Sequence, residues 1–343
     1  MTKFVFSKTD SLILKGVSML FIMIHNYWNI GIHLENEFKF DVMNISTLYN
    51  NVVSGSLFLK LRSISSFAFH YGVQIFIFLS GYGLYHSYNK NPKPFNFIYN
   101  RLKKNFSLMI FGLISFVVLR YFFINQTYNN KELLWWFFGK ATSLDNLTSY
   151  FSIQINSPWW FFGLVIQLYL LTPILIKIIN QWNWQGFIGI CIVCYTLLYV
   201  NLYTELISIN LFRNAPAHIP EFVLGFMMAK KPLNFDNKWI FVLVPAFILT
   251  QMYSFLFPYS FIIITFLFLS IYKTIKYYIP QFIKTMLTFV GGISMVIFCI
   301  HGDMRDYGFM SLQFKPEYFL IVYLFVVIVC SYLLFKIYQK IME

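Results

Sequence analysis

Charged residues are scarce in this chain. Of its 343 residues, 11% are charged and 58% are hydrophobic, and the mean hydropathy is +0.63. Soluble proteins carry about 25% charged residues, and a chain this apolar could not cover its own core with polar surface. The composition therefore excludes a cytosolic enzyme, a nucleic-acid-binding protein and a disordered chain. It predicts a protein that crosses a membrane several times.

Acidic residues and cysteines are also scarce. There are 13 acids against 26 lysines and arginines, and the net charge is +13. In a soluble protein this excess would indicate an anionic partner, whereas in a membrane protein basic residues hold loops on the cytoplasmic side. The four cysteines lie inside apolar runs and form no disulfide framework. Cys191 and Cys194 have redox-motif spacing but no soluble βαβ context, so we interpret them as small buried hydrophobes.

Long apolar runs dominate what is present. A membrane-spanning helix needs about 20 mostly apolar residues, and helices are the plausible spanning element because lipid offers no partners for backbone groups. The runs predict an all-α bundle of about ten transmembrane helices in a single integral-membrane domain, residues 1–343. The pair around Pro258 is either one long broken helix or two helices joined by a tight turn. The predicted spans are 16–33, 67–87, 105–124, 159–179, 186–203, 217–230, 239–256, 259–275, 286–302 and 317–337.

The distribution of basic residues predicts the orientation of these spans. If the N-terminus is cytoplasmic, most lysines and arginines fall in cytoplasmic segments, as the positive-inside rule requires. An even number of spans then places the C-terminus on the same side. We therefore expect a multi-pass protein of the cell inner (plasma) membrane with both termini in the cytoplasm.

Ionisable residues inside a predicted span indicate function, because burying them in lipid is costly. His25 lies near the middle of the first span, directly before Asn26, and neutral imidazole is well suited to accept a proton near neutral pH. The alternative is a histidine that hydrogen-bonds a neighbouring helix or lines a cavity. Lys15 opens the same span, about 15 Å from His25 along the helix axis. It either contacts a phosphate-bearing ligand or snorkels as an anchor; Arg101 and Lys104 suit a nucleotide diphosphate or belong to a positive-inside cluster.

Three acids and two further histidines lie near the outer ends of the predicted spans, away from the cytoplasm. Glu221 follows His218 by three residues, so the two lie on one helix face. There the carboxylate either orients an imidazole or accepts a hydroxyl hydrogen bond, or it is a helix-start carboxylate favoured by the helix dipole. Glu35 and Glu37 lie just beyond the first span and either bind sugar hydroxyls or are solvated. His301 lies near the outer end of a late span.

Five segments in order along the chain carry a resemblance to a known family. They combine a basic residue and glycine that precede a histidine, an aromatic stretch that ends in Ser-Gly-Tyr, a basic segment, a Trp-Trp helix that contains proline, and a final pair of apolar motifs. These segments are LKGVSMLFIMIHN (14–26), GVQIFIFLSGYGLYHSY (72–88), FIYNRLKK (97–104), SPWWFFGLVIQLYLLTPIL (157–175), and IPEFVLGFMMA (219–229) with ISMVIFCIH (293–301). The ordered set resembles the integral-membrane acyltransferase-3 proteins, which O-acetylate polysaccharides, peptidoglycan and related glycans.

The resemblance implies the reaction and its partners. It implies transfer of an acetyl or other short acyl group from cytoplasmic acyl-CoA to a hydroxyl of an extracytoplasmic or lipid-linked glycan. Acetyl-CoA would be a co-substrate, and no bound cofactor, metal or nucleic acid is expected. The implied catalytic residues are Asn26, Glu221 and His25, which acts either as general base or as the carrier of the acyl group in a covalent relay. Donor-binding residues would be Lys15, Arg101 and Lys104, and acceptor-binding residues Glu35, Glu37 and His301. The family usually has arginine where this chain has Lys15, and lysine lacks the bidentate fork of arginine.

Two other classes of function remain open at this point. Secondary transporters and lipid-linked glycan flippases share many spans and buried ionisable residues, although they often contain paired half-repeats with broken helices, and no such pair stands out here. A non-catalytic protein that docks a polymer synthase would need no histidine in mid-membrane. Release of CoA that depends on His25 would separate acyl transfer from both alternatives.

Overall fold

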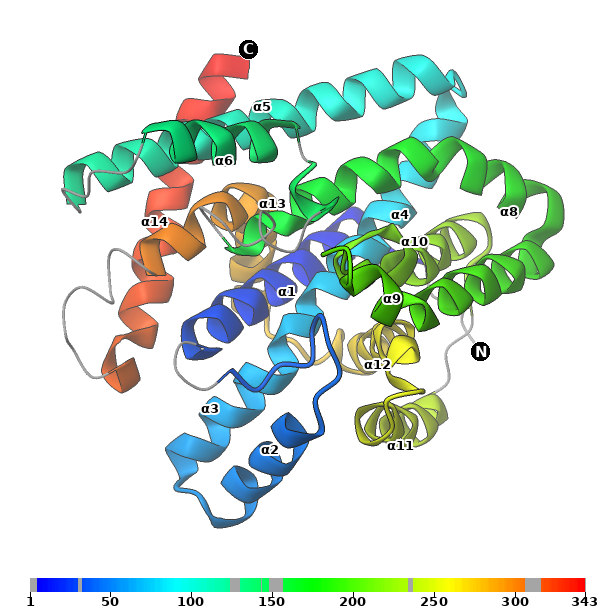
Figure 1. Ribbon diagram of the computed structural model, residues 1–343, viewed down its shortest axis with the longest axis horizontal. Coiled ribbons are helices and arrows are strands. Elements are labelled where there is room, and N and C mark those ends of the chain that lie inside the picture. The colour runs from blue at the N-terminus through cyan, green and yellow to red at the C-terminus, as the bar shows by residue number, and fades with distance from the viewer. Residues whose placement is uncertain are drawn as a thin grey trace.

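In a computed structural model, the described residues are 5–29, 33–123, 130–142, 144–147, 157–233, 237–305 and 316–342, and all their regular structure is helical, as predicted (Figure 1). Short 3₁₀ turns join several of the helices. The α-helices are α1 (Lys8–Asn29), α2 (Val42–Ser54), α3 (Leu57–Ala68), α4 (Gly72–Lys90), α5 (Pro94–Phe123), α6 (Asn130–Thr142), α8 (Trp160–Tyr199), α9 (Asn201–Glu205), α10 (Ala215–Lys230), α11 (Lys238–Met252), α12 (Ser260–Ile275), α13 (Gln281–Asp303) and α14 (Pro316–Met342).

Each of the ten predicted spans overlaps helical residues. The fourth and fifth correspond to two arms of α8, which bends at Asn183, and the pair around Pro258 is two helices, α11 and α12, joined by a 3₁₀ turn. Within the described residues, five helical stretches are long and apolar enough to cross a membrane: Leu57–Lys90, Ser157–Tyr199, Phe257–Ile275, Gln281–Asp303 and Phe319–Ile341. The count of ten spans and the cytoplasmic placement of both termini stay predictions.

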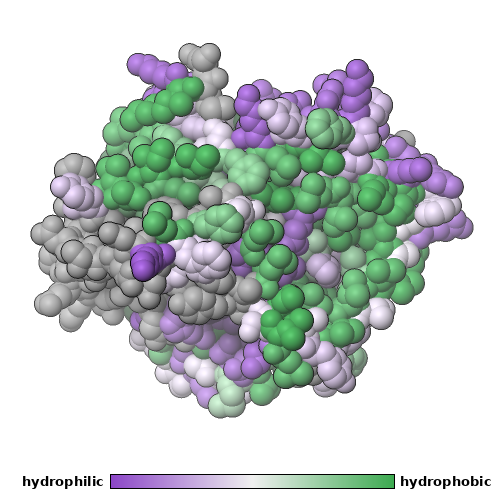
Figure 2. Space-filling view, turned by 45° about the horizontal axis from the view of Figure 1, so that its top comes forward, coloured by the Kyte–Doolittle hydropathy of each residue, from purple (hydrophilic) through white to green (hydrophobic). Residues whose placement is uncertain are grey.

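The outer surface of the helices is strongly apolar. Along α14, exposed hydrophobic side chains recur at every fourth position, which places them on one outward-facing stripe: Ile321, Phe325, Val329, Leu333 and Ile337. In Figure 2 hydrophobic residues form a broad band across the visible face, and hydrophilic residues gather along its upper edge. A patch of this extent is unfavourable in water and matches a lipid surface, so the protein is a membrane protein.

Close packing at two glycine pairs fixes the centre of the bundle. A Cβ on Gly16 of α1 or on Gly291 of α13 would collide with a backbone carbonyl oxygen of the facing helix. Gly81 of α4 and Gly225 of α10 make the same reciprocal approach. Small residues at such crossings let membrane helices pack backbone to backbone. Since α1 also packs against α4, the four helices hold their side chains in a fixed register.

The N-terminus of α1 is anchored by a reciprocal cap. The backbone N–H of Asp10 donates to Ser7 Oγ at 3.0 Å, and the backbone N–H of Ser7 donates to the Asp10 carboxylate at 2.9 Å. The Tyr272 hydroxyl of α12 donates to the other carboxylate oxygen at 2.6 Å. A cap of this kind stabilises a helix by about 1 kcal/mol. It fixes the start of the helix that carries both Lys15 and His25.

Candidate active site

A cavity of about 420 Å³ contains all three predicted donor-binding residues. Lys15 of α1 and Arg101 and Lys104 of α5 line it together. The other polar lining residues are Ser80, Asn105, Tyr169 and Tyr338. Its described lining residues include no aspartate or glutamate. We call it the basic cavity. Three cations without a carboxylate to neutralise them make it suited to an anionic ligand.

A second hollow of about 320 Å³ adjoins the basic cavity and shares Arg101 and Lys104 with it. Its other polar lining residues are neutral: Ser87, Asn91, Asn96 and Asn100. The Arg101 guanidinium donates a hydrogen bond to the Ser87 hydroxyl and lies over the Phe97 ring, 5.5 Å from its centroid. The two cations thus lie at the junction of two spaces, where an anionic centre with an extension on each side would fit.

His25 lines a much smaller cavity farther along α1. This cavity has about 30 Å³ of space and is also lined by Asn26, Glu37 and His70, so we call it the histidine cavity. His25 Nδ1 is 2.7 Å from the backbone carbonyl oxygen of Ser66 in α3. A carbonyl only accepts hydrogen bonds, so Nδ1 carries the proton and the lone pair of the neutral ring lies on Nε2. The ring is therefore held in the tautomer that a general base requires.

Asn26 links His25 to the end of α13. Its amide nitrogen donates to the Ile22 carbonyl oxygen at 2.9 Å and contacts His301 Nε2 at 3.3 Å. His301 is fully buried, and its Nδ1 faces backbone carbonyl oxygens of its own helix, so its Nε2 accepts from Asn26. Arg305 Nη1 donates to the backbone oxygen of Asn26 at 3.0 Å. Arg305 thereby places a positive charge close enough to interact electrostatically with both His25 and His301.

Glu37 reaches the histidine cavity from the segment that follows the first span. Burial, helped by the nearby Glu35 carboxylate and opposed by Arg213, raises the pKa of Glu37 to about 8. The carboxyl group is therefore mostly protonated at neutral pH and can both donate and accept a hydrogen bond. Glu35 does not line the cavity, and its buried Oε2 has no hydrogen-bond partner among the described residues.

Glu221 does not line the histidine cavity. Its Oε1 is 2.9 Å from Nδ1 of His218, which confirms that the two residues share a helix face. The other ring nitrogen of His218 is 3.0 Å from the Phe212 carbonyl oxygen. Trp160 stacks on His218 with centroids 5.7 Å apart, and Trp160 itself lines the histidine cavity. Glu221 is therefore connected to the cavity wall through His218 and Trp160.

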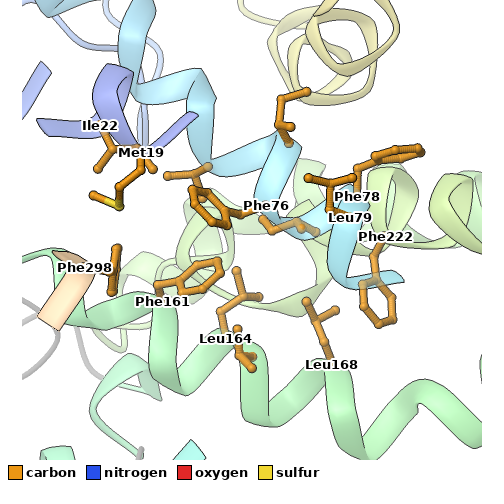
Figure 3. Close-up of a cluster of buried hydrophobic side chains, with 14 of the residues drawn as sticks. Met19, Ile22, Phe76, Phe78, Leu79, Phe161, Leu164, Leu168, Phe222 and Phe298 are labelled. Atoms are coloured by element: carbon orange, nitrogen blue, oxygen red, sulfur yellow. The ribbon is translucent and has the colours of Figure 1, made fainter. Parts of the chain in front are cut away.

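An apolar constriction lies between the basic and histidine cavities. It has about 10 Å³ of space, shares Met295 with the basic cavity, and shares four further residues with the histidine cavity. In Figure 3, Ile22 and Phe76 lie on one side of a gap, and Phe161 and Phe298 lie on the other. The three spaces follow one another beside α1 from Lys15 to His25. The constriction is lined by Ile22, Val73, Phe76, Phe161, Met295 and Phe298.

Two of these site residues escaped the sequence analysis. His70 lies near the end of a predicted span, where the sequence does not distinguish it from other histidines, although its ring centroid is 5.4 Å from that of His25. Arg305 belongs to no motif. Its position just beyond the predicted outer end of a span is unusual for a basic residue, and this is the feature that could have indicated it. The constriction could not be predicted, because its residues come from α1, α4, α8 and α13 and look like ordinary apolar helix positions.

Comparison with known proteins assigns the chain to a family. No group of three histidines, cysteines, aspartates or glutamates within the described ranges is arranged to hold a metal ion. No curated protein and no solved structure matches the chain. The acyltransferase domain of the acyltransferase-3 family matches residues 12–336, nearly the whole chain. The chain therefore belongs to the acyltransferase-3 family and is a membrane acyltransferase.

Proposed function

We propose that the protein is an O-acyltransferase of the cell inner membrane that moves an acetyl group from acetyl-CoA to a hydroxyl of a glycan. The glycan is extracytoplasmic or linked to a lipid. The observation that carries this proposal is the position of His25. A neutral imidazole, held with its lone pair on Nε2, lines a cavity that shares four wall residues with the constriction, and the constriction shares Met295 with the cavity of the three cations.

The basic cavity supports an acyl-CoA donor. Coenzyme A combines a phosphorylated nucleotide with a long, narrow arm that ends in the thioester. Its phosphates would contact Arg101 and Lys104 at the junction of the two large spaces, and the arm would extend past Lys15 toward the constriction. Lys15 contributes a point charge, because a single ammonium cannot form the two parallel hydrogen bonds of a guanidinium.

The acceptor would approach the histidine cavity past Glu35 and Glu37. A sugar hydroxyl both donates and accepts hydrogen bonds, and a protonated Glu37 offers both functions within the cavity wall. His301 would act indirectly, because it is buried behind Asn26. Glu221 would act indirectly as well, since it holds His218 beneath Trp160.

The transfer itself needs a base and a positive charge. His25 Nε2 takes the proton of the acceptor hydroxyl as its oxygen attacks the thioester carbonyl carbon. The tetrahedral intermediate then collapses, the carbon–sulfur bond breaks, and the imidazolium returns the proton to the departing thiolate, which gives free CoA. Both amide hydrogens of Asn26 are engaged by Ile22 and His301. Asn26 therefore positions Arg305, whose charge stabilises the developing oxyanion.

The test measures CoA release from radiolabelled acetyl-CoA by purified protein with a glycan acceptor. His25→Ala should lower the rate by about 10²- to 10⁴-fold, the usual contribution of a general acid–base group. His86→Ala is the matched control, because His86 is an exposed histidine that lines none of the cavities. Binding of acetyl-CoA should be unchanged in both variants.

Two results would contradict the proposal. One is acyl transfer at the normal rate by correctly inserted His25→Ala protein. The other is wild-type protein that moves the glycan or its lipid carrier across a vesicle membrane without releasing CoA, which is the behaviour of a transporter or flippase.

A further inference from the structure

Four side chains form the wall between the constriction and the histidine cavity. Ile22, Val73, Phe161 and Phe298 line both spaces, and each is at most 6% exposed. They come from α1, α4, α8 and α13, respectively. The rings of Phe161 and Phe298 lie 5.3 Å apart, and the glycine contact between Gly16 and α13 holds α1 and α13 at a fixed separation. The wall is therefore closely packed.

The free space beside this wall is small. The constriction has about 10 Å³ and the histidine cavity about 30 Å³, whereas a single water molecule requires about 10–15 Å³ of such space. A group of two or three heavy atoms fits beside His25, and a longer aliphatic chain does not. Close-packed interiors do not yield readily to added methylene groups. A longer chain would have to displace the aromatic rings.

We propose that Ile22, Val73, Phe161 and Phe298 set the length of the acyl group that the enzyme transfers and limit it to two or three carbons. This inference rests on the proposed function, since it assumes that the thioester reaches His25 from the basic cavity. The four residues are specificity determinants, because they contact the acyl chain and take no part in proton transfer. One methylene that fits or fails to fit such a pocket changes selectivity by about 10- to 200-fold.

The chain contains a matched pair for the test. Phe161 and Phe162 are adjacent, both are at most 5% exposed, and both pack against Phe298. Phe161 lines the two small spaces, and Phe162 lines neither. Transfer rates are measured with acetyl-, propionyl-, butyryl- and hexanoyl-CoA for the wild type, Phe161→Ala, Phe161→Leu and Phe162→Ala.

The wild type should prefer acetyl-CoA over butyryl-CoA by at least 10-fold in kcat/KM. Phe161→Ala should reduce this preference at least 10-fold, and Phe161→Leu should reduce it less. Phe162→Ala should keep the wild-type preference even where it lowers stability. The inference is overturned if Phe161→Ala and Phe162→Ala show the same preference. It is also overturned if kcat/KM of the wild type is as high with butyryl-CoA as with acetyl-CoA.

A variant that fills the wall gives the opposite test. Val73→Phe should abolish acetyl transfer and leave the dissociation constant of CoA unchanged, because the phosphates bind in the other cavity. Loss of CoA binding together with transfer would show a general packing defect and would count against the inference. Wild-type protein that turns over no acyl-CoA would refute the proposed function. Normal turnover with an unchanged preference in Phe161→Ala would refute only the role of the four wall residues in selecting the acyl chain.

Discussion

The basic cavity and the histidine cavity lie along the same helix, α1, and differ in almost every physical respect. The first has about 420 Å³ and three cations on long side chains, and the second has about 30 Å³ and two nearly fully buried imidazoles. Long charged side chains in a roomy space can hold a polyanion without exact fit. A small, water-poor space strengthens each electrostatic interaction and requires fixed geometry. If the proposed function holds, the donor binds at one end of α1 and the chemical step takes place farther along the same helix.

This separation can be tested kinetically. Substitutions in the basic cavity should raise KM for the acyl donor and leave kcat nearly unchanged, because they remove contacts made equally in the ground and transition states. Substitutions around the histidine cavity should lower kcat, because the charge that they stabilise develops only during transfer.

Arg305→Gln should have the largest of the remaining effects. Loss of one donor that stabilises a developing oxyanion lowers kcat by about 10²- to 10³-fold in well-studied cases. We expect a decrease of that order with an unchanged KM for acetyl-CoA, measured by steady-state kinetics of CoA release. Arg62→Gln is the control, because the Arg62 guanidinium lies over the Trp28 ring, whereas that of Arg305 donates to the backbone oxygen of Asn26 beside His25. A raised KM with normal kcat would place Arg305 in binding and would break the separation.

Lys104→Ala should have a smaller effect, and this effect should be on KM for acetyl-CoA instead of on kcat. Hydrogen bonds to charged groups contribute about 1.5–3 kcal/mol, so KM for acetyl-CoA should rise by about 10- to 150-fold while kcat changes little. Lys103→Ala is the matched control, because Lys103 is the exposed neighbour that lines neither large space. Equal effects of the two substitutions would show that the positive field of the whole segment matters and that no built donor site exists.

The two cavities also differ in how well the sequence predicts them. Lys15, Arg101 and Lys104 stood out because cations are conspicuous in an apolar chain, and the structure brings all three into one cavity. The helices were predictable from apolar runs because lipid requires them. The wall around His25 was not predictable. A helix that is apolar on all sides gives no pattern to show which face lines a cavity, so Phe161 and Phe162 look alike in the sequence.

Glu221 illustrates the same limit for a polar residue. Helical spacing predicts its contact with His218, and the 2.9 Å separation confirms that contact. The spacing contains no information about the neighbouring helix. Trp160 of α8 stands between the pair and the histidine cavity, and only the packing of α8 against α10 shows this.

Glu37→Gln should produce the smallest effect, a change in the pH dependence of stability. The folded protein holds the Glu37 proton up to a pH of about 8, whereas an exposed carboxyl releases it near 4.5. The folded state therefore binds more protons than the unfolded state in this window, and the wild type loses stability as pH rises through it. Glutamine removes this loss. The difference in Tm between Glu37→Gln and wild type should grow from pH 5 to pH 8 and then level off.

Glu35→Gln removes the neighbouring charge that helps raise the pKa of Glu37, so it should shift the upper end of this window to lower pH. A Tm difference that is constant with pH would show that Glu37 is ionised like a surface carboxylate and that the histidine cavity is as well solvated as the basic one.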